Sequence, residues 1–128
     1  MAFTHAVTVG VQPSGGGVSR TASYSASSEL AMTETIADSS TDYEITTSID
    51  VSAVKSFYVV SDRAVTLETN SGSSPADTIS LKAGIPYIWN TDSYDTFKLG
   101  TDVTAIFITN ASGGTATLEL RCIQDATP

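Results

Sequence analysis

The feature that most constrains the fold of this chain is a series of short apolar runs with period-two alternation, separated by turn-forming residues. The clearest pair is residues 103–108 and 117–123, with the Gly-rich segment 110–115 between them. Alternation over four to eight residues is typical of a half-buried β-strand, and Asn, Ser and Gly favour a tight reversal. No window of eleven or more residues has the apolar spacing of an amphipathic helix. The chain is therefore predicted to be all-β.

The composition supports this prediction. Thr and Ser account for 37 of the 128 residues, and the β-branched residues Thr, Val and Ile suit a pleated surface better than a helix. Leu, Ile, Val and Phe contribute 29 residues, enough for one core in a single domain of this length. One cysteine cannot form an internal disulfide, so the core must hold the fold without one.

We expect a two-sheet antiparallel β-sandwich, or jelly roll, of about eight strands with an N-terminal arm. The arm and its Gly-rich break cover residues 1–17, and residues 18–128 form the single sandwich domain. In the turn before residue 87, Gly84 can take the positive φ that a tight reversal often needs. The segments expected to be extended, including the arm, are 3–11, 18–26, 29–37, 43–49, 57–60, 65–69, 79–81, 87–89, 103–108 and 117–123.

Several classes of protein are not expected. The chain has no apolar run near the length of a membrane helix, and its first residues lack the pattern of a secretory signal. Six basic side chains are scattered among fourteen acidic ones, giving a net charge of −8. Such a field repels a polyanion, so a nucleic acid is not expected as a partner. Without an apolar run of sufficient length, a membrane is not expected either.

No catalytic, metal-binding or cofactor-binding residues are predicted. His5 is the one histidine, and it is expected to be an exposed arm residue and not a general base. Asp38, Asp42, Asp92, Asp95 and Asp102 lack the spacing of a calcium loop and are typical turn residues. The strand residues Glu44, Glu68 and Glu119 are explained by a solvated outer face. The chain is therefore predicted not to be an enzyme and to need no cofactor.

Three further residues have two interpretations each. Trp89 could form a sugar-stacking platform with Tyr87 and Tyr94, but core or interface packing is favoured. Asn110 begins a glycosylation pattern that is interpreted only as a surface turn. Cys122 lies in an apolar run and is interpreted as a small buried hydrophobe.

Residues 43–125 resemble the small β-rich head proteins of tailed bacteriophages and prophages. The resemblance is carried by VKSFYVVSDRAVTLETN (54–70), DTISLKAGIPYIW (77–89) and AIFITNASGGTATLELR (105–121). It implies a jelly roll acting as a capsid decoration, or cement, protein that binds the major capsid protein and stabilises the assembled head. The expected location is then the virion, assembled in the host cytoplasm.

The residues offer contact candidates for such a role. Val7, Val9 and Val11 alternate along the arm and could enter a neighbouring subunit, and self-association is expected. Tyr94 and Phe97, in a long Asp-rich loop, are further candidates, with ordinary loop anchoring as the alternative. A carbohydrate- or receptor-binding module of a phage tail or fibre is the alternative function. An unrelated bacterial β-sandwich interaction domain also remains open.

Overall fold

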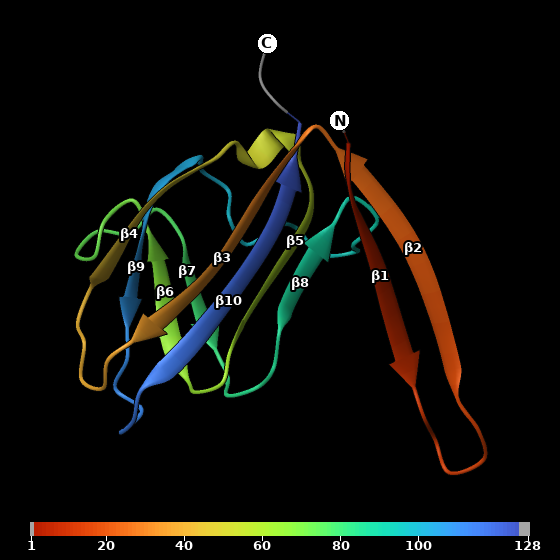
Figure 1. Ribbon diagram of the computed structural model, residues 1–128, viewed down its shortest axis with the longest axis horizontal. Coiled ribbons are helices and arrows are strands. Elements are labelled where there is room, and N and C mark those ends of the chain that lie inside the picture. The colour runs from red at the N-terminus through yellow and green to blue at the C-terminus, as the bar shows by residue number, and fades with distance from the viewer. Residues whose placement is uncertain (1, 126–128) are drawn as a thin grey trace.

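The computed structural model describes residues 2–125, and nearly all regular structure in this range is β-strand (Figure 1). A single 3-10 turn, η1 (Val51–Ala53), precedes the fifth strand. A search of the described residues for a helix long and apolar enough to cross a membrane finds none. The strands are β1 (Phe3–Val11), β2 (Val18–Ala26), β3 (Ser28–Ile36), β4 (Tyr43–Ile49), β5 (Val54–Ser61), β6 (Val65–Thr69), β7 (Thr78–Leu81), β8 (Tyr87–Asn90), β9 (Val103–Thr109) and β10 (Ala116–Gln124).

Strands β3 to β10 form two four-stranded antiparallel sheets, with orders β3-β10-β5-β8 and β4-β9-β6-β7. The pairs β3–β10, β4–β9, β5–β8 and β6–β7 are nested along the chain like one long folded hairpin. The pairs β5–β10 and β6–β9 then join the nested pairs into the two sheets. This winding is the strand order of a jelly roll. The prediction of an all-β two-sheet sandwich is confirmed.

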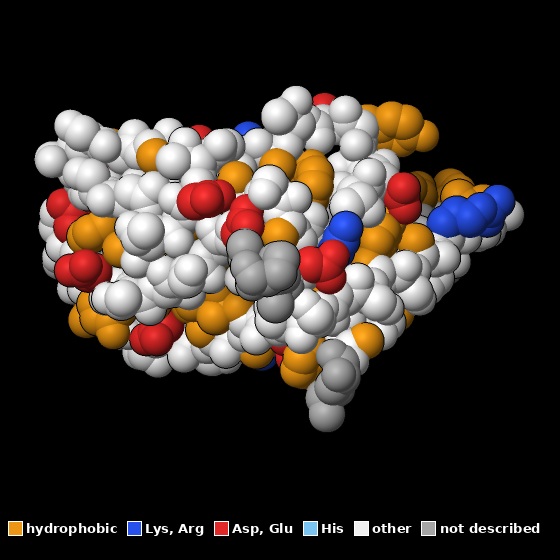
Figure 2. Space-filling model, turned by 90° about the horizontal axis from the view of Figure 1, so that it is seen from above, with side chains coloured by type: hydrophobic (Ala, Val, Ile, Leu, Met, Phe, Trp, Pro, Cys, Tyr) orange, Lys and Arg blue, Asp and Glu red, His pale blue; other side chains and the backbone are white. Residues whose placement is uncertain are grey.

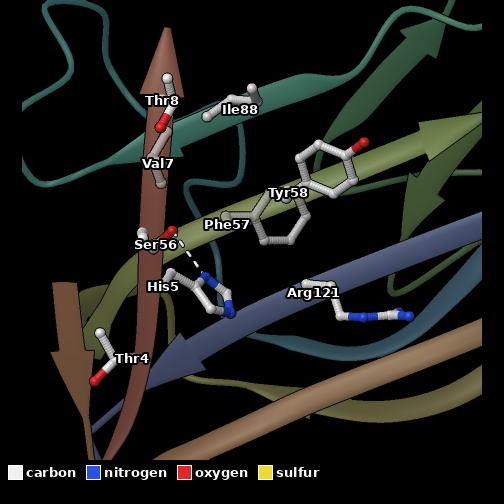
Figure 3. A pocket seen from close by; sticks show the side chains of 10 residues that line it. Thr4, His5, Val7, Thr8, Ser56, Phe57, Tyr58, Ile88 and Arg121 are labelled. Atoms are coloured by element: carbon white, nitrogen blue, oxygen red, sulfur yellow. Dashed lines mark hydrogen bonds between the residues drawn. The ribbon is translucent and has the colours of Figure 1, made fainter. Parts of the chain in front are cut away.

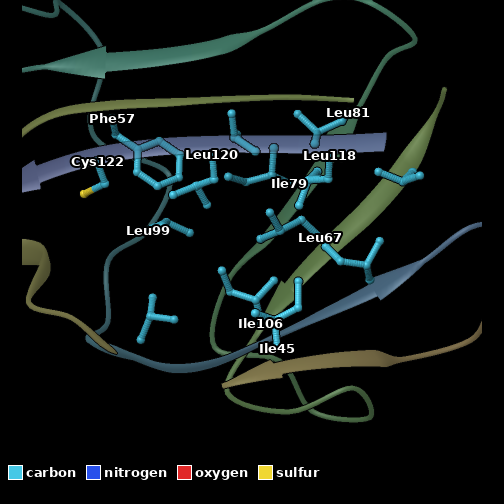
Figure 4. Packing of buried hydrophobic residues seen from close by; sticks show 14 of the residues in the cluster. Ile45, Phe57, Leu67, Ile79, Leu81, Leu99, Ile106, Leu118, Leu120 and Cys122 are labelled. Atoms are coloured by element: carbon cyan, nitrogen blue, oxygen red, sulfur yellow. The ribbon is translucent and has the colours of Figure 1, made fainter. Parts of the chain in front are cut away.

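The core lies between the two sheets (Figure 4). It forms because alternate residues of each strand face inward, so Leu118, Leu120 and Cys122 of β10 meet residues of the opposite sheet. Phe57 and Leu67 are fully buried at its centre, and Leu99 enters it from the loop before β9. The buried Cys122 thiol has its pKa raised to about 12 by desolvation, which fits its interpretation as a small apolar residue.

Turn residues behave as their chemistry predicts, with one exception. Gly84 has a φ of 72° and Gly113 a φ of 92°, both in reversals between strands. Asn110 differs from expectation because its side chain is fully buried. Its Nδ2 donates to the carbonyl oxygens of Ile36, Ala37 and Gly114, and its Oδ1 accepts from the Ser112 amide and hydroxyl. The predicted surface turn is therefore organised around a buried amide that is unavailable for glycosylation.

The N-terminal strands form a separate two-stranded ribbon, residues 3–26, beside the sandwich of residues 28–125 (Figure 1). β1 and β2 pair along their whole length, from Phe3 opposite Ala26 to Val11 opposite Val18. Residues 12–17 are the loop at the far end of this hairpin, not a flexible break. β2, expected within the sandwich, thus pairs with β1 and lies outside both four-stranded sheets. Residues 18–26 have too few apolar side chains for a strand inside a two-layer core.

Candidate interaction surface

The ribbon has two chemically different faces. Cross-strand partners share a face, so Val7, Val9 and Val11 lie with Ala22, Arg20 and Val18 on one side. The other side is small and polar: Thr4 bonds Ser25 at 3.1 Å and Thr8 bonds Thr21 at 2.7 Å. The predicted alternation of three valines along one face is therefore present. The valines are displayed by a paired hairpin, so β1 already has a partner strand.

His5 joins the base of the ribbon to the outer face of the sandwich (Figure 3). Its Nδ1 lies 3.0 Å from Oγ of Ser56 on β5, and its Nε2 lies 3.5 Å from Oε2 of Glu29 on β3. The imidazole side chain is only 15% exposed. The expectation that His5 would be an exposed arm residue is wrong, because the ribbon folds back against the sheet at this point.

The contacts run from Ser56 to His5 to Glu29, which is the order of serine, histidine and acid in a hydrolytic triad. A nucleophile must meet its substrate, yet Ser56 is only 1% exposed. Its hydroxyl lies against the imidazole and is almost closed to solvent. The three side chains therefore hold the ribbon to the sandwich.

A second contact holds the ribbon from β2. The Tyr24 hydroxyl donates to Oδ2 of Asp92 at 3.0 Å, tying the ribbon to the loop that follows β8. Desolvation, together with the bond to Asp92 and the charge of that carboxylate, raises the pKa of Tyr24. The Tyr24 hydroxyl therefore remains a donor at neutral pH.

Between the ribbon and the outer face of the sheet lies an open hollow of about 410 Å³ (Figure 3). Ile88 and Tyr58 form its sheet wall, Val7 lies on the ribbon side, and Arg121 lies at the edge, where its guanidinium donates to the carbonyl oxygens of Met32 and Leu120. The remaining lining residues are Thr4, His5, Ala6, Thr8, Ser56 and Phe57.

The exposed large hydrophobic side chains fall mostly in two segments, the end of the ribbon and residues 85–94, and Ile88 of the second segment lines the hollow. Val9, Val11 and Val18 at the end of the ribbon are 62%, 64% and 66% exposed. Ile88 lies in β8 and Ile85 lies just before it, and both are exposed. Tyr94 is fully exposed in the loop after β8. Of the exposed large hydrophobics among residues 2–125, Tyr43 alone lies elsewhere. Apolar side chains gathered in this way are typical of an interaction surface.

Of the contact residues predicted from the sequence, the structure leaves most accessible and packs one against the core. Val9, Val11 and Tyr94 are exposed, and Val7 lines the hollow. Phe97 instead packs inward: its ring stacks on Trp89 at 4.6 Å and meets Phe57 edge-on at 5.2 Å. Phe97 therefore anchors its loop, because its ring is already covered by core aromatics.

Trp89 and Tyr87 also pack inward from β8 against the core. The Trp89 indole N–H donates to the Asp95 carbonyl oxygen, and the Tyr87 hydroxyl accepts from the Lys98 amide. The core-packing interpretation of Trp89 is confirmed. Tyr94 is consequently left without the two aromatic neighbours that a stacking platform would use.

The acidic turn residues act as local hydrogen-bond acceptors. Asp102 accepts from the Val51 amide, and Asp77 accepts from the amides of Gly100 and Thr101. Among residues 2–125, no group of three or more His, Cys, Asp and Glu side chains is placed to hold a metal ion. These carboxylates shape the loops beside β8 and β9.

Charge is divided unevenly between the ribbon and the sandwich. The ribbon contains Arg20 and no acidic residue, whereas residues 28–125 carry five basic and fourteen acidic side chains, a net charge of −9. On the face seen in Figure 2, most of the acidic side chains lie over the sandwich, and the projecting end at the right carries a basic side chain. The ribbon end is therefore the part of the chain best suited to approach an acidic surface.

No protein-family model, curated protein or solved structure matches this chain. The resemblance to phage head proteins stays a prediction that rests on the three quoted segments.

Proposed function

We propose that this protein is a non-enzymatic virion structural protein, a capsid decoration protein that binds the major capsid protein and stabilises the assembled head. The observation that carries the proposal is the gathering of exposed hydrophobic side chains on the ribbon and on residues 85–94. A surface of this kind supports a role in which the chain is partly covered by another protein.

The rest of the molecule suits that role. The jelly roll has a continuous core without a disulfide, so it can hold the ribbon in a fixed position. A protein that binds only the assembled shell stabilises the shell by mass action, and the effect grows with the ratio of concentration to Kd. The acidic, Ser/Thr-rich exterior favours solubility when many copies are displayed close together.

The test is cosedimentation of the purified protein with empty capsids assembled from the major capsid protein of the same genome, followed by heating. We expect binding, and a higher disruption temperature for the loaded capsids. The variant Val9→Asp should bind at least tenfold more weakly, because a carboxylate would be placed in an apolar contact. The control Thr21→Asp, on the polar ribbon face, should bind like the wild type.

Absence of cosedimentation would refute the proposal. The alternative of a tail or fibre module that binds carbohydrate or a receptor has one supporting observation, the fully exposed ring of Tyr94. It predicts glycan binding that is lost in Tyr94→Ala and unaffected in Val9→Asp. The inward packing of Trp89 and Tyr87 makes the decoration role the better supported one.

A further inference from the structure

We propose that the hollow beside the ribbon receives the ribbon end of a second copy of this chain. The hollow is the one described above, between Val7 on the ribbon and Tyr58 and Ile88 on the sheet. The inference concerns self-association and does not depend on binding to a capsid.

The chain presents both halves of a complementary apolar contact. Val11 and Val18 are directly opposite each other in the ladder, and Val9 follows on the same face. Together they make a continuous apolar end that is about two-thirds exposed. The hollow offers apolar side chains on both of its sides and is open enough to admit them. Seating this end there would bury side chains that are otherwise in contact with water.

The ribbon end cannot fill the hollow of its own chain. β1 pairs with β2 without interruption over nine residues, and a strand of that length spans about 30 Å. His5 and Tyr24 hold its base to the sandwich, while its far end projects past β8 (Figure 1). The occupant must therefore come from another molecule.

Within a second copy of this acidic chain, the ribbon is the part whose charge suits this contact. The ribbon has one cationic side chain and no anionic one, and it would approach a sandwich with a net charge of −9. Arg20 lies opposite Val9 on the apolar face, so it would enter with the valines. Glu119 is exposed on the outer face of β10, two residues from Arg121 at the edge of the hollow.

Because each chain carries both surfaces, the contact can be reciprocal in a twofold dimer or repeat head to tail in a ring. The two arrangements share the same contact and differ in mass.

The first test is sedimentation velocity of the purified protein over a range of concentrations. We expect an assembly of two or more copies that dissociates on dilution. Val11→Asp should raise the dissociation constant at least tenfold. The control Ser19→Asp makes the same charge change on the polar ribbon face and should leave the constant unchanged. A monomer at concentrations up to about 1 mM would overturn the proposal, and so would an assembly that both variants leave unchanged.

The second test locates the contact by disulfide formation between two singly substituted chains. Val11→Cys and Ile88→Cys proteins are mixed and oxidised, and we expect the mixed disulfide-linked dimer. Ser19→Cys replaces Val11→Cys as the control and should give at most a trace. Cys122 is fully buried with its pKa raised to about 12, so it does not compete. An equal yield from both mixtures, or none from either, would overturn the placement. Neither test uses capsids, so their failure is distinguishable from failure of the proposed function.

Discussion

His5 is the residue through which the attachment of the ribbon can be measured. An isolated two-stranded hairpin is marginally stable in water, so the β1–β2 ladder depends on its contact with the sandwich. His5→Ala removes the bond to Ser56, worth about 1 kcal/mol, and the partly exposed contact with Glu29, worth up to about 1 kcal/mol. The ribbon should therefore open more easily by about 2 kcal/mol, or about 30-fold in its opening equilibrium.

Native-state hydrogen exchange measures this opening amide by amide. Protection of the β1 and β2 amides should fall about 30-fold in His5→Ala, while the β5 and β10 amides at the core should keep theirs. Thr8→Ala is the comparison variant: it removes one bond of about 1 kcal/mol inside the ribbon, to Thr21, and leaves the attachment at His5, so protection should fall only about fivefold. Equal losses in ribbon and core, or no loss in the ribbon, would refute the view that His5 attaches an otherwise unstable hairpin.

Three further predictions concern the sandwich. Asn110→Ala removes the side-chain amide that donates to three carbonyl oxygens, although the Ser40 amide and the Ser112 hydroxyl still reach those of Ala37 and Gly114. The free energy of unfolding should fall by about 2 kcal/mol in urea titrations, and an unchanged midpoint would contradict the buried network. Above pH 9 the Cys122 thiol ionises in the unfolded chain but stays protonated in the fold until about pH 12. The free energy of unfolding should therefore fall by about 1.4 kcal/mol per pH unit in this window, and Cys122→Ala should remove that contribution when both proteins are compared across it. Phe97→Ala removes the ring stacked on Trp89 and should shift the tryptophan emission to the red at a cost of about 2 kcal/mol; an unshifted spectrum would mean that the loop does not shield the indole.

The two-layer fold could be predicted because the alternation of apolar and polar residues is visible within each core strand. Residues 65–69 and 103–108 alternate clearly, and β6 and β9 lie where expected. The apolar run 57–60 correctly indicated a central strand, since β5 lies between β10 and β8. The run was shorter than the strand, because Ser56 and Ser61 are polar residues that the fold buries.

The surface was harder to predict because its signals are non-local. The six residues between β1 and β2 include three glycines and resemble a flexible break, and the polar face of β2 hides its pairing. The available signal was that two segments of equal length, 3–11 and 18–26, flank this loop with Val11 and Val18 at its ends. Nothing local to His5 indicates Ser56 or Glu29, which the winding of the jelly roll brings to it from β5 and β3.

The position of β10 has a consequence for how the molecule acquires its shape during translation. β10 lies in the interior of its sheet, with β3 on one side and β5 on the other, and Gln124 pairs with Ser28. β3 and β5 cannot complete their pairing with β10 until residue 124 has left the ribosome. Their inward-facing apolar side chains stay partly uncovered until then. The β1–β2 hairpin pairs only nearby residues, but alone it is marginally stable, and the residues that hold it, Ser56, Glu29 and Asp92, emerge later. The ribbon is therefore fixed in place only once the sandwich beneath it has formed.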